Sequence, residues 1–391
     1  MLPMKLIVPL YRALHIVQRS CFILAATLLV ACGGSSEPEA SNSTAPSTNP
    51  VPSTAVAATP VAAVADGNGK LKIFILAGQS NMQGYGKVEL GADMKSPTRT
   101  PHILGGTGSL RGMVNNSPDA FRFLVEPVKT VTYTVNGVTQ TYKDWMSRDD
   151  VWVSSWDSGA IGKTTELRNG ALNVGFGSEK VLPAGYIGPE FGFGHMVGNG
   201  LADKVLLVKA SWGGKSLAVD FRPPSSGGVT GPYYNEVLAK VRMVLADVKK
   251  YYPAYDGKGF EVAGFGWHQG WNDRVTTAYV AQYEVNLANL IRDMRKDLGL
   301  PAMPFVIGNT GMAVGDKDSN GFKLITAQGN VADITKYPEF AGTVSTVDTR
   351  PFYDPLTSPE VGFGYHWHYN GQSYYQIGEG MGNAMLKLIK P

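Results

Sequence analysis

The chain has 391 residues, with 35 basic and 32 acidic side chains and a formal net charge of +3. Because the charges nearly balance and no basic run is interleaved with aromatic residues, the composition argues against nucleic acid as a partner. The length allows one large α/β domain in addition to an unfolded amino-terminal segment.

The first 31 residues have the pattern of a secretory signal peptide. Early basic residues precede an apolar run over residues 21–31, which is too short to cross a bilayer comfortably. The run ends in Leu29-Val30-Ala31-Cys32, which resembles a bacterial lipobox with Cys32 as the lipidated first mature residue. A plainly exported protein with a chance cysteine is the alternative. We expect an exported bacterial lipoprotein, facing the periplasm or outer surface, that contacts the membrane only through its lipidated amino terminus.

A second segment, residues 32–66, follows the signal and consists mainly of Ser, Thr, Ala, Pro and Glu, with no aromatic residue. Such a composition cannot bury enough apolar surface to offset the entropy of ordering the chain. We therefore predict a lipidated cysteine followed by a disordered tether, and a folded domain over residues 67–391. Cys21 leaves with the signal, so the mature chain is expected to have no disulfide of its own.

The stretch from Ile73 to Gly84 is the centre of the predicted domain. A short apolar run breaks at Gly78, so Ser80 is expected on a tight turn at the carboxyl end of a buried strand. Open α/β sheets bind their ligands at this end. A strand followed by an ordinary Ser/Asn helix cap would also fit this stretch taken alone. Met82 stands where a Gly-x-Ser-x-Gly elbow has its second glycine, which argues against the α/β-hydrolase arrangement.

The block Gly78-Gln79-Ser80-Asn81-Met82 resembles the first block of the SGNH hydrolases, and most of all the carbohydrate acetylesterases of the sialate O-acetylesterase type. The resemblance extends over the chain after residue 66 through four short blocks. It implies a three-layer α/β fold, with a mostly parallel sheet and helices on both faces. It also implies that Ser80 is a nucleophile.

An irregular region follows the first strand, from about Val88 to Ala184. Within it, residues 130–135 and 138–142 flank Asn136-Gly137, a strong hairpin signal because both turn residues must accept positive φ. We expect an insertion with a β-hairpin that shapes the substrate site. Gly188-Pro189-Glu190 then opens a helix, and we give this tripeptide no catalytic role.

A second buried strand is predicted over Lys204–Ala210, followed by Ser211-Trp212-Gly213-Gly214-Lys215-Ser216. Two glycines directly after a strand leave backbone amides open toward a developing oxyanion, although an ordinary strand-to-loop turn explains them equally well. In the resemblance, Gly214 takes the position of the oxyanion-hole glycine, and Phe221–Pro224 resembles a substrate-side loop.

A third strand, residues 259–267, leads into His268-Gln269-Gly270-Trp271-Asn272-Asp273. Gly270-x-Asn272-Asp273 matches the general SGNH pattern, whose asparagine donates to the oxyanion. The acetylesterases instead show Trp-His-Gln-Gly, with the glutamine in that role. We favour Gln269 as the donor and keep Asn272 as the alternative, and Asp273 also fits a cap of the next helix.

The remaining elements alternate between helices and strands, which predicts a mostly parallel sheet with helices on both faces. Helices are expected over residues 234–251 and 277–298, and strands over 304–309 and 340–347. The segment Asp316–Gly321 copies the first half of a calcium loop. Its twelfth position is Ala327 rather than an acid, so we interpret it as a solvated turn.

A serine esterase needs a base that takes the hydroxyl proton. His366 and His368 lie just before the final helix, where SGNH hydrolases keep their histidine; spacing to the closest relatives favours His366, and spacing to more distant ones favours His368. Neither has an aspartate three residues before it. The orienting acid would come from elsewhere, or the site would be a Ser-His dyad; the candidate acids are Asp348, Asp354 and Glu360. A metal held by His366 and His368 is less favoured than the catalytic role, because no third ligand is evident. We predict no cofactor, because a serine-histidine mechanism requires none.

Together these features predict a serine esterase that removes O-acetyl groups from carbohydrates, either sialic acid or a plant or bacterial polysaccharide. Ser80 would attack the acetyl carbonyl and His366 would take its proton. The amides of Ser80 and Gly214 and the side chain of Gln269 would hold the oxyanion. The alternative is a non-catalytic carbohydrate-binding surface lipoprotein with the same fold. A lipase is less favoured, because we find no long apolar lid segment.

Overall fold

The computed structural model describes residues 68–95, 102–156, 167–178, 183–356, 358–359 and 365–390. The predicted signal peptide and tether lie outside these residues, so both stay predictions, as does the domain boundary at residue 67. Among the described residues, no helix combines the length and apolar character that crossing a membrane requires.

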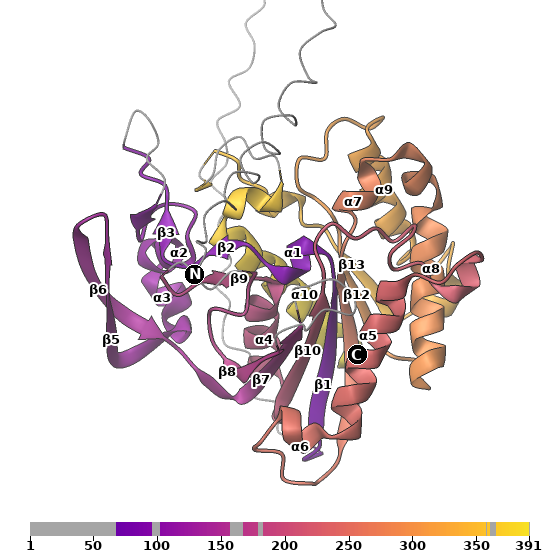
Figure 1. The fold of residues 1–391 in the computed structure, drawn as a ribbon, viewed down its shortest axis with the longest axis horizontal. Helices are drawn as coiled ribbons and strands as arrows, with labels where there is room; N and C mark the ends of the chain where they lie inside the picture. The colour runs from indigo at the N-terminus through magenta and orange to yellow at the C-terminus, as the bar shows by residue number, and fades with distance from the viewer. Residues whose placement is uncertain are drawn as a thin grey trace, which may run out of the picture. The chain divides into compact units, whose positions relative to one another are not determined.

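The main sheet has seven strands among the described residues, in the order β13-β12-β11-β1-β10-β7-β8 (Figure 1). Neighbouring strands run parallel, except that β8 is antiparallel to β7. This arrangement confirms the predicted mostly parallel sheet. The bounds are β1 Leu71–Gly78, β7 Arg148–Trp156, β8 Leu167–Leu172, β10 Val205–Ser211, β11 Phe260–His268, β12 Phe305–Gly308 and β13 Val344–Val347.

Strand β1 lies in the middle of the sheet and is buried along its whole length. Successive side chains of a strand point to opposite faces. Ile73 and Ile75 accordingly join one hydrophobic cluster, whereas Phe74 and Leu76 join the other. A continuous apolar run is the pattern of a strand that is covered on both faces, which is why the sequence identifies β1.

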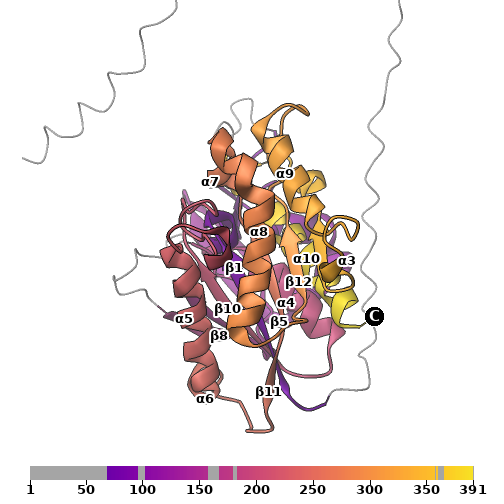
Figure 2. The same cartoon turned by 90° about the vertical axis from the view of Figure 1, so that its right-hand side faces the viewer.

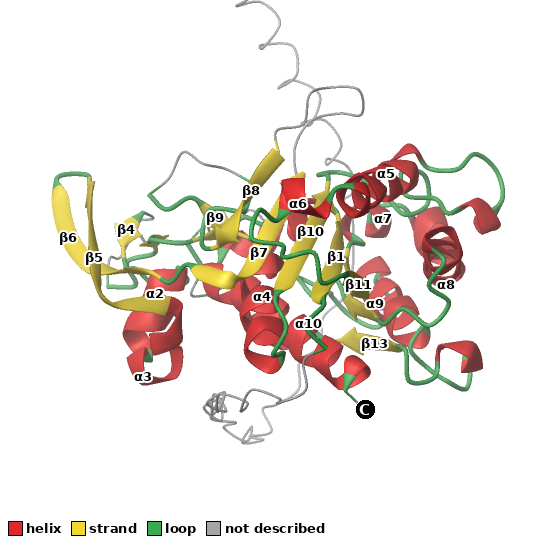
Figure 3. Ribbon diagram, turned by 90° about the horizontal axis from the view of Figure 1, so that it is seen from below, coloured by secondary structure: helices red, strands yellow, loops and turns green. Residues whose placement is uncertain are grey.

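Helices cover both faces of the sheet, as predicted. Figure 2 shows α5 (Pro232–Ala246) and α8 (Thr277–Leu298) on one side, and Figure 3 shows α4 (Pro189–Gly200) and α10 (Gly371–Ile389) on the other. Helices α4 and α10 touch through their backbones: a Cβ added at Gly378 would lie 2.1 Å from the carbonyl oxygen of Pro189. The remaining α-helices are α1 Ser80–Gln83, α2 Leu110–Asn116, α3 Pro118–Phe121, α6 Val248–Tyr251, α7 Trp271–Arg274 and α9 Asn320–Asn330.

The predicted insertion contains the expected hairpin, β5 (Val125–Val135) with β6 (Val138–Trp145), and φ is positive at both Asn136 and Gly137. The prediction of an irregular region is wrong at β7 and β8, which both belong to the main sheet: β7 pairs in parallel with β10 and antiparallel with β8. Charged and serine residues interrupt the apolar pattern of β7, so its sequence does not look like a buried strand. Two small ladders complete the region: β2 Gly86–Lys87 with β9 Tyr186–Ile187, and β3 Leu90–Gly91 with β4 Ile103–Leu104.

The turns that follow β1, β10 and β11 meet at one edge of the sheet, because these strands are adjacent and parallel. The amide of Trp212 donates to the carbonyl of Gly78 (3.2 Å), and the amide of Gln79 donates to the carbonyl of His268 (3.4 Å). These two hydrogen bonds connect the beginnings of the turns after β1, β10 and β11, which are far apart in sequence.

Candidate active site

Ser80 begins α1 directly after the carboxyl end of β1, and 6% of its surface is exposed. Among the described residues, none forms a hydrogen bond with its hydroxyl. The turn after β10 lies against it: a Cβ added at Gly213 would be 3.6 Å from the Cβ of Ser80. Gly214 has a φ of +68° and open space beside it. The open space beside Gly214 is compatible with its predicted oxyanion role, which stays a prediction.

Gln79, the residue before the serine, connects the turn after β1 with the turn after β11. Its side-chain oxygen accepts hydrogen bonds from the amides of Gly270 (3.2 Å) and Asn272 (3.1 Å) and from the side-chain nitrogen of Gln269 (3.3 Å). Only 1% of Gln79 is exposed, so these bonds form away from water. In the sequence, Gln79 is only one residue of the Gly78–Met82 block, and no local pattern indicates this function.

The side chain of Gln269 is held by the same frame. Its nitrogen donates to the carbonyl of Lys215 (2.9 Å) and to Asp273 (2.5 Å), and its oxygen accepts from the hydroxyl of Tyr283 (2.8 Å). To donate to an oxyanion, Gln269 would have to exchange one of these bonds. The side chain of Asn272, the alternative donor, makes no hydrogen bond to a described residue. The assignment of Gln269, rather than Asn272, as the oxyanion donor stays a prediction.

Asp273 connects the frame to the loop after β10. Its carboxylate accepts from the amides of Leu217 (2.8 Å) and Ala218 (2.9 Å), and complete burial raises its pKa to about 6. The predicted capping role is therefore wrong. The N-cap residue of α8 is Thr276, and the carboxylate of Asp273 instead binds backbone amides of the loop after β10. The partners lie 55 and 56 residues away in sequence, a contact that only the fold reveals.

The two late histidines lie in η6 (His366–Tyr369), a short 3-10 segment that packs against α1 and β2. The ring of His366 stacks on Tyr85, with centroids 3.9 Å apart and planes 8° apart. Its Nδ1 is buried and makes no hydrogen bond with a described residue, and burial lowers its pKa to about 4. His368 instead lies with Nε2 2.9 Å from the hydroxyl of Tyr353.

The structure therefore brings the histidine segment beside the serine helix without a hydrogen bond from Ser80 to an imidazole. Such bonds are often long in unliganded enzymes and tighten in the substrate complex. All four residues of η6 have φ between 50° and 60°. Left-handed backbone costs non-glycine residues about 1–2 kcal/mol each, and strain of this kind gathers at functional sites.

The candidate orienting acids have other partners or lie outside the described residues. Asp348 forms an ion pair with Arg350 (2.7 Å) and accepts from the side chain of Asn309 (3.3 Å). Asp354 accepts from the amide of Leu356 (3.0 Å). Glu360 lies outside the described residues. Both histidine rings contact tyrosines: His366 contacts Tyr85, Tyr365 and Tyr369, and His368 contacts Tyr353. The sequence alone did not assign Tyr85 or Tyr353 to the site.

A model of the family described as carbohydrate esterase, sialic acid-specific acetylesterase, matches residues 172–387, more than half of the chain. The chain belongs to this family. It is therefore a carboxylic ester hydrolase, with an O-acetyl esterase activity toward carbohydrates. The alternative of a non-catalytic binding protein is accordingly not retained.

Three solved structures resemble this carbohydrate esterase distantly. A protein from Arabidopsis thaliana is 17% identical, with 81% of this chain and 98% of that chain covered and a TM-score of 0.46. A carbohydrate acetylesterase from Xanthomonas citri is 13% identical, with 80% and 55% covered and a TM-score of 0.44. NanS is 13% identical, with 71% and 77% covered and a TM-score of 0.39. A comparison with curated proteins found no match.

The esterase also has a buried ion pair beneath the serine helix. The ammonium of Lys209 on β10 donates to Glu190 (2.7 Å), to the carbonyl of Gln83 at the end of α1 (2.7 Å) and to the carbonyl of Phe176 (2.8 Å). Both charged side chains are fully buried. The other oxygen of Glu190 accepts from the amide of Gly188 (2.8 Å). Glu190, which the sequence analysis interpreted only as a helix start, therefore helps to fix α1.

We expect a Lys209→Met variant to lose about 3–5 kcal/mol of unfolding free energy, because it leaves the Glu190 carboxylate buried without a cation. Chemical denaturation of the purified enzyme measures this loss. A Lys258→Met variant, which breaks an ion pair of two largely exposed side chains, is the control and should unfold like the wild type. Equal stability of the two variants would contradict the role given to Lys209.

Proposed function

We propose that this esterase works through an acetyl-enzyme on Ser80. The observation that carries the proposal is the position of Ser80 at the end of the central strand, directly against the Gly213-Gly214 turn. Ser80 lies where the turns after β1, β10 and β11 meet. Backbone amides at such a turn are the usual donors to a developing oxyanion.

In the proposed reaction, the Ser80 oxygen attacks the acetyl carbonyl while an imidazole takes the hydroxyl proton. The amides of Ser80 and Gly214, with one side-chain amide from Gln269 or Asn272, bind the oxyanion. The sugar hydroxyl then leaves with the proton from the imidazole. Water attacks the acetyl-enzyme with the imidazole again as base, and acetate is released. Apart from the attacking water, each step uses only groups of this chain.

His366 is the proposed base, and His368 is the alternative. A pKa of about 4 keeps the His366 imidazole neutral at physiological pH, which a base requires. Its parallel stacking on Tyr85 supports a dyad in which ring packing, rather than a carboxylate, orients the imidazole. By contrast, the Nε2 of His368 already forms a hydrogen bond with the hydroxyl of Tyr353.

The proposed substrate is an acetylated carbohydrate outside the cytoplasm. The signal-like pattern of residues 1–31 and the lipobox-like cysteine support an exported enzyme that is held at a membrane by its amino terminus. The family assignment supports the carbohydrate and the acetyl group.

We expect a Ser80→Ala variant to lose at least about 1,000-fold in kcat/KM, because removing the nucleophile leaves only binding and the oxyanion donors. Acetate release from a chromogenic acetyl ester measures it. A Ser155→Ala variant is the control, since its hydroxyl is also buried and makes no hydrogen bond with a described residue. Full activity in Ser80→Ala would refute the proposed mechanism.

The pH dependence of kcat/KM tests His366 as the base. Because burial lowers its pKa from 6.5 to about 4, the neutral imidazole persists down to about pH 4, and the rate should fall only below that value. The carboxylate of Asp273 titrates near pH 6 in the same frame, so the profile is also measured in an Asp273→Asn variant. A fall centred near pH 6.5 in both proteins would contradict the assignment.

A further inference from the structure

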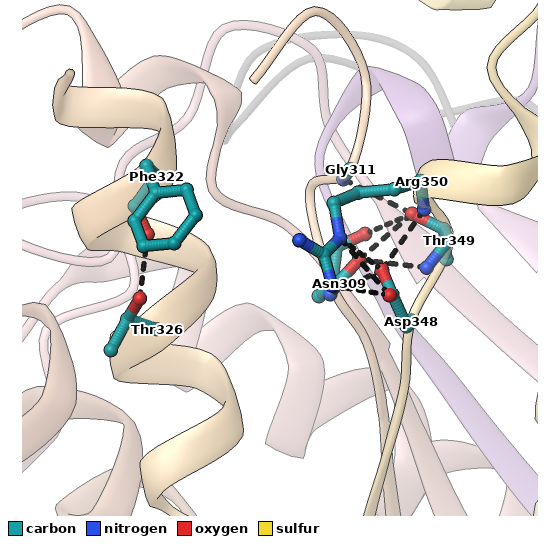
Figure 4. Close-up of polar contacts among 7 residues, drawn as sticks. All are labelled: Asn309, Gly311, Phe322, Thr326, Asp348, Thr349 and Arg350. Atoms are coloured by element: carbon teal, nitrogen blue, oxygen red, sulfur yellow. Dashed lines mark hydrogen bonds and ion pairs between the residues drawn. The ribbon is translucent and has the colours of Figure 1, made fainter. Parts of the chain in front are cut away.

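A groove of about 530 Å³ lies between α9 and β13, the outer strand of the main sheet. Figure 4 shows Phe322 from α9 on one side of it and a polar cluster on the other. The cluster consists of Asn309, Asp348 and Arg350, which follow the ends of β12 and β13. None of these side chains has a role in the proposed acetyl transfer.

Hydrogen bonds and an ion pair connect the side chains of the polar wall of this groove. Arg350 binds Asp348 through Nε (2.9 Å) and a terminal nitrogen (2.7 Å), and the guanidinium holds the pKa of Asp348 below its usual range. Asn309 is buried, and its side-chain oxygen accepts from the amide of Thr349 (2.9 Å). Arg350 and Asp348 nevertheless remain 50% and 44% exposed. They therefore present fixed donors and acceptors to the groove.

The two walls together fit the chemistry of a sugar. A pyranose ring has an apolar C–H face, which an aromatic ring such as Phe322 can cover, and hydroxyl pairs at its edge. Fixed carboxylate and guanidinium groups bind such hydroxyls, and a few converging polar groups beside apolar surface are typical of ligand sites. Because Asp348 already neutralises the charge of Arg350, the cluster suits a neutral sugar better than one with a carboxylate.

The position of the groove determines the size of the ligand. Strand β13 is three positions from β1 in the sheet, or about 14 Å away, and both strands end at the same edge. One sugar unit is too short to lie in the groove and also present its acetyl group to Ser80, whereas an oligosaccharide is long enough to span this distance.

We propose that the groove lined by Phe322, Asp348 and Arg350 is a distal subsite for a neutral oligosaccharide, whose acetylated unit lies at Ser80. The position of the ester rests on the proposed function. Binding in the groove does not depend on it, so the two can fail separately.

The experiment measures calorimetric binding of unacetylated xylotetraose, a neutral oligosaccharide, to the full-length protein. Phe322→Ala and Arg350→Ala should each weaken binding about tenfold, the size of one aromatic or hydrogen-bonding contact. Phe322→Leu keeps apolar packing and should weaken binding similarly. Arg292→Ala is the matched control. Arg292 forms an ion pair with Glu339, and the two side chains are 42% and 45% exposed, much like Arg350 and Asp348. This pair lies beside Phe340, outside the groove. The control variant should bind like the wild type.

The proposal is overturned if the wild type does not bind xylotetraose, if the groove variants bind it unchanged, or if Arg292→Ala loses as much as they do. Stronger binding of anionic sialyllactose than of xylotetraose would overturn the neutral class of ligand. Because no ester is present, these outcomes are independent of hydrolysis. Loss of the proposed Ser80 chemistry, seen as full activity in Ser80→Ala, would leave the binding result unchanged.

Discussion

The side-chain oxygen of Gln79 holds the turns of the site together. It accepts from two backbone amides of the turn after β11 and from Gln269, in surroundings closed to water. Gln269 and Asp273 extend the network to the loop after β10. Buried polar networks of this kind rigidify a structure when every member has a partner. Ser80, next to Gln79, therefore has its backbone fixed before substrate binds, which is what preorganised catalysis needs.

The parts of the fold that the sequence predicts are those with local signals. A continuous apolar run predicts β1, and Asn136-Gly137 predicts a hairpin turn because few other pairs accept its backbone angles. Strand β7 has no such signal, since serines and charged residues replace the apolar run. Its place in the sheet depends on pairing with β10, whose residues lie 54 positions later in the chain, as in the pair Val151 and Val205. No local sequence pattern indicates that pairing.

The candidate site divides in the same way. The glycine breaks and the family resemblance predict that the site residues lie at strand ends. The hydrogen-bond partners of the polar side chains cannot be predicted in this way, because they are distant in sequence: Gln79 and Gln269 are 190 residues apart, and Lys209 and Gln83 are 126 apart. The role of Asp273 was mistaken for this reason: a helix cap is a local explanation, and the true partners lie on another strand's loop. Residue type alone could have indicated only that a buried Lys209 needs an anion.

The histidine end of the site departs most from the usual SGNH pattern. No aspartate stands three residues before either imidazole, and the rings lie against Tyr85 and Tyr353. Stacking orients a ring without supplying charge, so it favours the neutral imidazole rather than the cation that forms during the reaction. The four residues of η6 have left-handed backbone conformations, which are strained for residues other than glycine. Contacts with the surrounding structure must therefore stabilise this segment.

The account depends on Ser80 being the reactive hydroxyl, and covalent labelling tests this most directly. The purified enzyme would be treated with a fluorophosphonate, digested, and mapped by mass spectrometry. We predict one phosphonyl adduct, on the peptide that contains Gln79-Ser80-Asn81, with loss of esterase activity in proportion to labelling. Complete inactivation with the adduct on another residue and Ser80 unmodified would contradict the account.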